Sequence, residues 1–197
     1  MQYVVPLALG AALAASIASA RLPVDDLSPE TSAEIAASRT VVQQFGATLK
    51  NTLQEAVNNG GLVNGVTVCR DQAHPIAEQL SQNLEMLLGR TSLKIRNPDH
   101  APDNWELAVL KQFEARKAQG EPVDELEFSA VIDDDQGQKT FRYMKAIPTI
   151  TLCLGCHGEN IPAEVDVKLQ ELYPYDKARG FKAGELRGAF TIAKPLP

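Results

Sequence analysis

The chain has 197 residues, of which 44% are hydrophobic and 22% are charged, and its formal net charge is −6 at pH 7. These values suit one globular domain with its own core, and they exclude a disordered chain. An acidic balance with only 6% aromatic residues argues against nucleic-acid binding.

Residues 1–20 carry no charged side chain and end in the small-x-small triplet Ala18-Ser19-Ala20. This pattern predicts a signal peptide over 1–20 and a mature domain over 21–197. An uncleaved anchor is the alternative, because no Lys or Arg precedes the apolar run, but that run is shorter than the roughly 20 residues of a membrane span. We expect a periplasmic or otherwise exported protein with no stable membrane span after cleavage.

A long amphipathic helix is predicted at the start of the mature domain. Ser28 and Pro29 have the form of an N-cap followed by a first helical residue. Apolar residues then recur at helical spacing: Ile35, Val42, Phe45, Leu49 and Leu53. We expect this helix to end at Asn58-Asn59-Gly60-Gly61, because glycine favours helix C-termini.

Three segments follow before the pattern changes. Residues 62–88 form a second helical region, which we expect to break near His74-Pro75, because proline lacks an amide donor. Residues 89–101 are irregular and basic. Asp103 and Glu106 then have the spacing of a capping box at the start of a further helix.

The next part of the chain has the composition of β-structure. Residues 126–132 and 140–147 are rich in β-forming side chains and flank an acidic, glycine-containing turn, which predicts a hairpin. Alternation on the second strand sends Arg142 and Met144 to one face of the sheet. After a short helix, residues 189–193 form a last strand.

Cys153-Leu154-Gly155-Cys156-His157 is the attachment sequence of a c-type haem. Two thiols separated by two residues can each add across one vinyl group of the same porphyrin. The His that follows is then held beneath the iron as its proximal ligand. The motif predicts one covalent haem c per chain, and the attachment of haem outside the bacterial cytoplasm agrees with the predicted export.

Two alternatives use the same side chains. Cys153 and Cys156 could form a redox disulfide, and the three cysteines of the chain with His157 could bind zinc. A redox disulfide does not need the adjacent His, and its usual place is early in a βαβ pattern, whereas this pair lies late in the chain. A zinc site needs Cys69 to return from far upstream, and exported proteins seldom use such sites. We therefore favour haem attachment.

No Met or His follows His157, so a sixth iron ligand must come from upstream, or the distal side is open. The candidates are Cys69, Met144, Met86, His74 and His100. Cys69 is left over once the motif has used two thiols, and a free thiol in an oxidising compartment is a liability unless it is buried or used. Met144 lies on a strand near the motif. The residues alone leave Cys69 and Met144 equally favoured, with an open or His-ligated site behind them.

The motif and the segments around it resemble the PAS-like periplasmic c-type haem domains. This family occurs as small exported proteins of bacteria and cyanobacteria, and as ectodomains of histidine kinases and chemoreceptors. The resemblance covers most of the mature chain, in the same order. The matching segments are Val68-Cys69, 89–94, Arg96-Asn97-Pro98, Ala101-Pro102-Asp103, Trp105-Glu106, Arg142-Tyr143, 153–158, Tyr173-Pro174, Gly180-Phe181 and 184–189.

This resemblance implies an α+β fold over 21–197, with a PAS-like antiparallel sheet, flanking helices and a long N-terminal helix. It also implies that Cys69 is the distal haem ligand, opposite His157. Haem propionates that are partly buried need cationic partners, and the nearest basic residues are the candidates. They are Arg90, Lys94, Arg96 and Arg142.

A thiolate ligand predicts a low reduction potential, because an anionic sulfur stabilises ferric iron. Loss of Cys69 on reduction, or its displacement by a small gas, would shift the helix that carries it. We therefore expect a non-enzymatic redox or gas-sensing domain that acts on a separate redox or signalling protein. The alternatives are a periplasmic electron-transfer cytochrome with His157 and Met144 as ligands, and a peroxidase-like haem with an open distal side.

Overall fold

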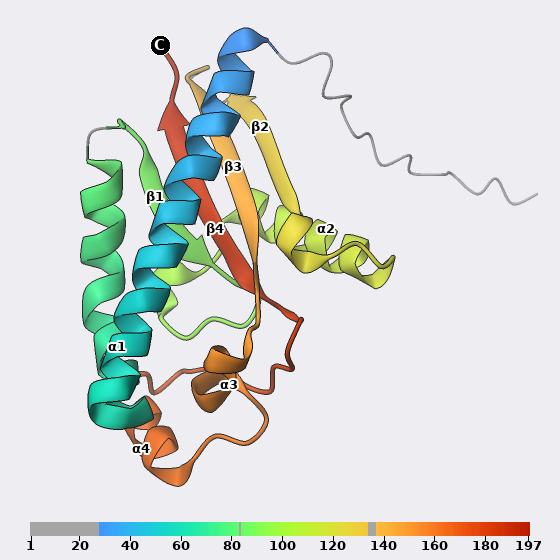
Figure 1. Ribbon diagram of the computed structural model, residues 1–197. Coiled ribbons are helices and arrows are strands. Elements are labelled where there is room, and N and C mark those ends of the chain that lie inside the picture. The colour runs from blue at the N-terminus through green and yellow to red at the C-terminus, as the bar shows by residue number, and fades with distance from the viewer. Residues whose placement is uncertain (1–27, 83, 134–136) are drawn as a thin grey trace, which may run out of the picture.

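The computed structural model describes residues 28–82, 84–133 and 137–197, so the predicted signal peptide lies outside the described part (Figure 1). Within that part the chain forms a four-stranded antiparallel sheet in the order β1-β4-β3-β2. The strands are β1 (Leu87–Thr91), β2 (Glu127–Asp133), β3 (Lys139–Pro148) and β4 (Leu186–Pro195). The helices are α1 (Pro29–Ser81), α2 (Asn104–Ala118), α3 (Thr151–His157) and α4 (Ala163–Leu172), with 3₁₀ turns η2 (Pro98–His100) and η3 (Val123–Glu125). The predicted α+β class, antiparallel sheet and long N-terminal helix are confirmed.

Helix α1 consists of two arms that fold back on each other (Figure 1). It begins at Ser28, whose Oγ accepts a hydrogen bond from the Thr31 amide at 3.2 Å. Gly60 and Gly61 interrupt the helical geometry, and Gly61 has a φ of 71°, which glycine adopts without steric cost. The predicted end of the first helix is therefore the kink between the arms. Beyond it the second arm packs against the first through Phe45, Leu49, Ala73 and Ala77.

Two expectations for the second arm and the chain after it are wrong. The helix does not break near His74-Pro75 but continues to Ser81. Proline removes one backbone donor, and the packing of this arm against the first outweighs that loss. The end of region 62–88 and the start of segment 89–101 instead form β1, which pairs with β4 along its whole length.

Strand β3 divides the core between the two faces of the sheet, as alternation along a strand requires. Arg142 and Met144 face α2, and Met144 is buried there with Phe113 of that helix. Phe141 and Tyr143 face the other way and pack against α1. The predicted hairpin of β2 and β3 is confirmed in register, although part of its turn lies outside the described residues.

Helix α2 begins at the predicted capping box. The Asp103 carboxylate accepts a hydrogen bond from the Glu106 amide at 2.7 Å, and the Glu106 carboxylate accepts one from the Asp103 amide at 3.0 Å. Its apolar side, which carries Val109, Leu110 and Phe113, is buried on the sheet. Among the helices that the structure describes, none combines the length and the hydropathy needed to cross a bilayer.

Candidate functional site

A cavity of about 450 Å³ lies between the kinked end of α1, helix α3 and the end of the sheet where β1 and β4 pair. Its apolar wall comes chiefly from the two arms of α1 and from Phe190 of β4. Its polar lining includes Cys69, His74, Arg90, Arg96, His100, Cys153, Cys156, His157 and Arg187. An apolar wall with a few convergent polar groups, in a volume between about 300 and 1,000 Å³, is typical of cofactor pockets.

Helix α3 brings the two thiols and the imidazole of the attachment motif to this cavity. Cys153 and Cys156 stand three residues apart, and residues at that spacing share one helix face. Both thiols are free and half-buried. His157 is the last residue of the helix, and it lines the cavity beside the two thiols. The motif therefore presents two thiols and one imidazole to the same space.

The imidazole of His157 is fixed in one tautomer by the backbone. Its Nδ1 lies 2.8 Å from the Ala178 carbonyl oxygen. Because a carbonyl can only accept a hydrogen bond, Nδ1 carries the proton and Nε2 keeps a free lone pair. Burial, with the nearby Arg187 and Arg96 cations, lowers the pKa of His157 well below its ordinary value. A neutral imidazole with a free Nε2 is the form that binds a metal.

Cys69 lines the same cavity from the second arm of α1. Burial raises the pKa of its thiol, and the nearby Arg90 and Arg96 cations offset part of that rise. The back-folding of α1 at its kink thus brings this thiol to the cavity that also holds Cys153 and Cys156. The fold therefore allows Cys69 and the motif to contact the same occupant of the cavity.

The other ligand candidates lie in different places. His74 and His100 line the cavity, and burial lowers the pKa of His100. Met144 is fully buried in the cluster between α2 and the sheet, and Met86 is buried in the cluster on the α1 face. Neither methionine is among the residues that line the cavity. The geometry therefore gives no support to His157 and Met144 as an axial pair.

Four arginines line the cavity. Arg70 is exposed to solvent, and the other three differ in how their charge is balanced. Arg96 forms an ion pair with Asp176 at 3.1 Å. Arg187 instead donates to Ser92 Oγ at 3.2 Å and to the Lys94 carbonyl oxygen at 3.4 Å. Among the residues that the structure describes, neither Arg90 nor Arg187 has an ion pair with a carboxylate.

The two unpaired guanidinium groups fit an anionic occupant of the cavity. Burial lowers the pKa of Arg90, and burial together with the Arg96 and Arg90 cations lowers the pKa of Arg187 to about 10. A desolvated cation without a counter-ion is costly, and a carboxylate in the cavity would remove that cost. Arg187 is not among the cations predicted from the sequence, although the matching segment 184–189 contains it.

Two of the predicted basic residues are not brought to the cavity. Lys94 donates to the Arg179 carbonyl oxygen at 3.3 Å, and its Nζ lies 4.8 Å from the centre of the Phe181 ring. Arg142 pairs with Asp103 at 2.8 Å and with Glu106 at 3.2 Å, on the side of the sheet that α2 covers. Of the four predicted cations, Arg90 and Arg96 therefore line the cavity, and Lys94 and Arg142 do not.

The two alternative uses of the thiols are not seen. All three cysteines are free thiols, so Cys153 and Cys156 form no disulfide. In the part of the chain that the structure covers, no group of three His, Cys, Asp or Glu side chains is arranged to hold a metal ion on its own.

Gly188 forms part of the cavity wall where β4 passes β1. A Cβ at this position would lie 2.3 Å from the Thr91 backbone oxygen and 3.0 Å from Ser92 Cβ. We expect Gly188→Ala to lower the free energy of unfolding by about 1–3 kcal/mol, because the two segments must separate to admit the methyl group. Chemical denaturation measures the loss. Gly89→Ala is the control, since its Cβ would meet Thr191 Cγ2 at an ordinary 3.5 Å, and equal losses in both variants would contradict the prediction.

Comparisons with known proteins agree with this fold. A family model described as Tll0287-like matches residues 25–195. Among solved structures, the chain is similar to the cyanobacterial heme protein Tll0287, with a TM-score of 0.64 at 23% sequence identity. The alignment covers 87% of this chain and 98% of that one. A comparison with curated proteins gives no match.

Proposed function

Because the chain belongs to the Tll0287-like family, we propose that it is a haem-binding protein with one covalently attached haem c in the cavity between α1 and α3. One observation carries this proposal: a single cavity gathers all three thiols of the chain, a neutral His157, and Arg90 and Arg187, which have no ion pair with a carboxylate of the described residues. The similar crystal structure is that of a heme protein, which agrees with the proposal.

Each residue of the cavity has a distinct part in holding the cofactor. The Cys153 and Cys156 thiols form the two thioether links, because they share one face of α3. His157 binds the iron through Nε2, while its Nδ1 proton stays on the Ala178 carbonyl. Cys69 would supply the second protein ligand to the iron. When bound, the haem supplies an iron that changes between ferric and ferrous states.

Arg90 and Arg187 hold the propionate groups. Neither guanidinium group forms an ion pair with a carboxylate of the described residues, and guanidinium groups bind carboxylates by paired, charge-assisted hydrogen bonds. Arg96 contributes less to this role, because its charge is already paired with Asp176. Arg90 and Arg187 therefore form ion pairs only when the cofactor is bound.

Replacing Arg187 should have opposite effects on the two forms of the protein. We expect Arg187→Met to raise the free energy of unfolding of the haem-free protein by about 1 kcal/mol, because an unpaired cation is removed from the cavity. The same change should destabilise the holoprotein, because a propionate loses its partner. Denaturation of both forms measures this, with Lys94→Met as the control that removes a cation outside the cavity. A loss of stability in both forms would contradict the role.

The function that follows is a redox or gas sensor rather than an enzyme. A thiolate from Cys69 favours ferric over ferrous iron, so the protein works at low potential. Cys69 binds the ferrous state more weakly, so reduction or a small gas can displace it and release the second arm of α1 from the cofactor. A separate redox or signalling partner would detect the displacement of Cys69 through the movement of this arm. The electron-transfer alternative requires Met144 to leave the α2 core.

Export completes the proposal. The predicted signal peptide over 1–20 directs the chain to the periplasm or outside the cell, where covalent haem attachment takes place.

The direct test of the proposed function is the absorption spectrum and intact mass of the purified protein in its ferric and ferrous states, with and without CO. We expect a covalent haem whose ligand set changes on reduction. A colourless protein with the mass of the bare polypeptide would overturn the function, and unchanged ligands without CO binding would overturn the sensor.

A further inference from the structure

Asp176 is a buried carboxylate behind the candidate proximal histidine. Its side chain is 2% exposed, and it is not among the residues that line the cavity. One carboxylate oxygen accepts from Arg96 Nε at 3.1 Å and from the Ala178 amide at 2.8 Å. The other accepts from Arg96 Nη2 at 3.1 Å and from Arg179 Nε at 2.9 Å. A carboxylate that accepts four hydrogen bonds is fixed in place.

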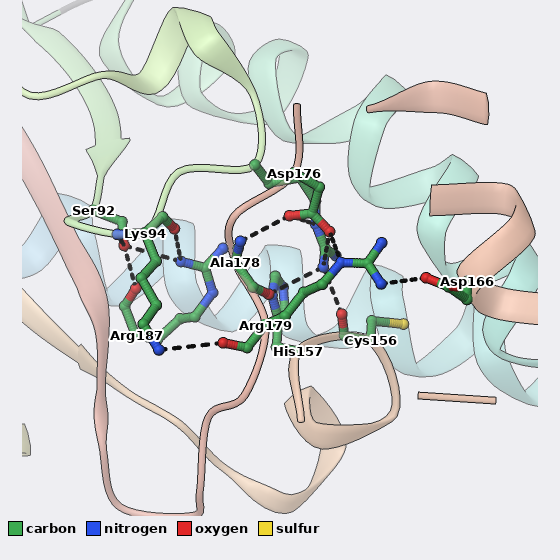
Figure 2. A network of polar contacts seen from close by, with 10 residues as sticks. Ser92, Lys94, Cys156, His157, Asp166, Asp176, Ala178, Arg179 and Arg187 are labelled. Atoms are coloured by element: carbon green, nitrogen blue, oxygen red, sulfur yellow. Dashed lines mark hydrogen bonds and ion pairs between the residues drawn. The ribbon is translucent and has the colours of Figure 1, made fainter. Parts of the chain in front are cut away.

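The partners of Asp176 lead directly to His157 (Figure 2). Ala178, whose amide binds Asp176, offers its carbonyl oxygen to His157 Nδ1 at 2.8 Å and to Arg96 Nη2 at 3.2 Å. Arg96 Nη2 also donates to the Cys156 carbonyl oxygen at 2.5 Å. The same ion pair therefore holds both the end of α3 that carries the imidazole and the carbonyl that orients it.

The charge of Asp176 matters as well as its hydrogen bonds. Arg96 and His157 compete for the Ala178 carbonyl oxygen. While Asp176 balances the charge of Arg96, the carbonyl keeps enough electron density to accept strongly from His157 Nδ1. Without Asp176, the Arg96 cation would withdraw electron density from the Ala178 carbonyl oxygen. The hydrogen bond from His157 Nδ1 would then weaken, and Nε2 would become a poorer electron donor.

We propose that Asp176 is a positioning residue for His157, which sets the orientation and the donor strength of the imidazole through Arg96 and the Ala178 carbonyl. This inference rests on the proposed function, because it concerns the haem iron that His157 binds. A more strongly donating imidazole stabilises ferric iron, so Asp176 acts in the same direction as the Cys69 thiolate.

The test compares two aspartates that belong to one network. Asp176→Asn should raise the ratio of ferrous to ferric protein at a fixed ambient potential by at least about tenfold, which is about 59 mV for one electron. Asp166→Asn removes the same charge from the other side of Arg179, where the carboxylate is 34% exposed and touches neither Arg96 nor Ala178. That control should change the ratio by less than about threefold, because solvent screens it. Equal shifts in both variants would overturn the proposal, as would a lowered melting temperature with an unchanged potential.

If the Asp176→Asn protein does not accumulate, a second variant tests the same proposal. Arg179→Gln removes one neutralising donor from Asp176 and leaves Arg96 and Ala178 in place. We expect the ferrous-to-ferric ratio to fall, and to fall further than in Lys168→Gln, which removes the same charge from α4, where Lys168 pairs with Glu171 rather than with Asp176. Equal falls would overturn the proposal. A wild-type protein without covalent haem would instead overturn the proposed function, so the two failures are distinguishable.

Discussion

Replacing Cys153 and Cys156 together with alanine is expected to abolish covalent haem attachment completely. Both thiols lie on one face of α3 and open into one cavity, and among the described residues the remaining thiol, Cys69, comes from a different helix. Each thioether consumes one thiol, so the double variant has none left in the motif. His157 would keep its hydrogen bond to Ala178, which leaves only reversible axial ligation. Intact mass measurement after denaturation detects the loss, because a non-covalent haem dissociates.

The matched control for this prediction is Cys69→Ala. It removes a thiol from the same cavity but leaves both thioether positions, so the covalent haem should remain at the wild-type level. Each single variant of the motif should keep one link. Retention of covalent haem in the double variant would contradict the assignment of the motif, and its loss in Cys69→Ala would move one thioether to Cys69.

The parts of the fold that the sequence predicts correctly depend on neighbours close in the chain. The capping box joins Asp103 to Glu106, three residues apart, and both of its hydrogen bonds form. The hairpin and the kink at Gly60-Gly61 have the same local character. Strand β1 was missed because its five residues include Gly89 and Arg90, and it becomes a strand only by pairing with β4 from the far end of the chain.

The candidate site likewise has residues that the sequence predicts from local signals and residues whose surroundings only the fold determines. The attachment motif is a local signal, and Cys153, Cys156 and His157 all line the cavity. The surroundings of the basic residues depend on distant parts of the chain. The sequence shows each basic residue, but it does not show the carboxylate with which that residue pairs. Arg142 is paired with Glu106 because α2 lies against its face of the sheet, whereas Arg187 remains without a carboxylate partner among the described residues. Asp176 gave no signal in the sequence, because its importance comes from two hydrogen bonds that the fold creates.

Cys69→Ala should raise the reduction potential by the largest amount of any single substitution in the cavity. The variant loses an anionic ligand that stabilises ferric iron, and the neutral ligands available, His74, His100 or water, do not replace its charge. We expect at least about a hundredfold rise in the ferrous-to-ferric ratio at a fixed potential, which is about 120 mV for one electron. Spectroelectrochemical titration measures the shift, and the EPR spectrum of the ferric protein should change with it.

Met144→Leu separates this result from the competing ligand set. Met144 is buried with Phe113 in the α2 cluster, so its replacement by a side chain of similar volume should leave the potential and the EPR spectrum unchanged. The opposite pattern, in which Met144→Leu alters the spectrum and Cys69→Ala does not, would assign the sixth position to methionine. It would also require β3 to turn Met144 to the other face, against the register that pairs it with Thr191 and Phe128. The ligand switch depends on the same comparison, because Cys69 lies on the second arm of α1, whereas Met144 lies on a central strand of the sheet.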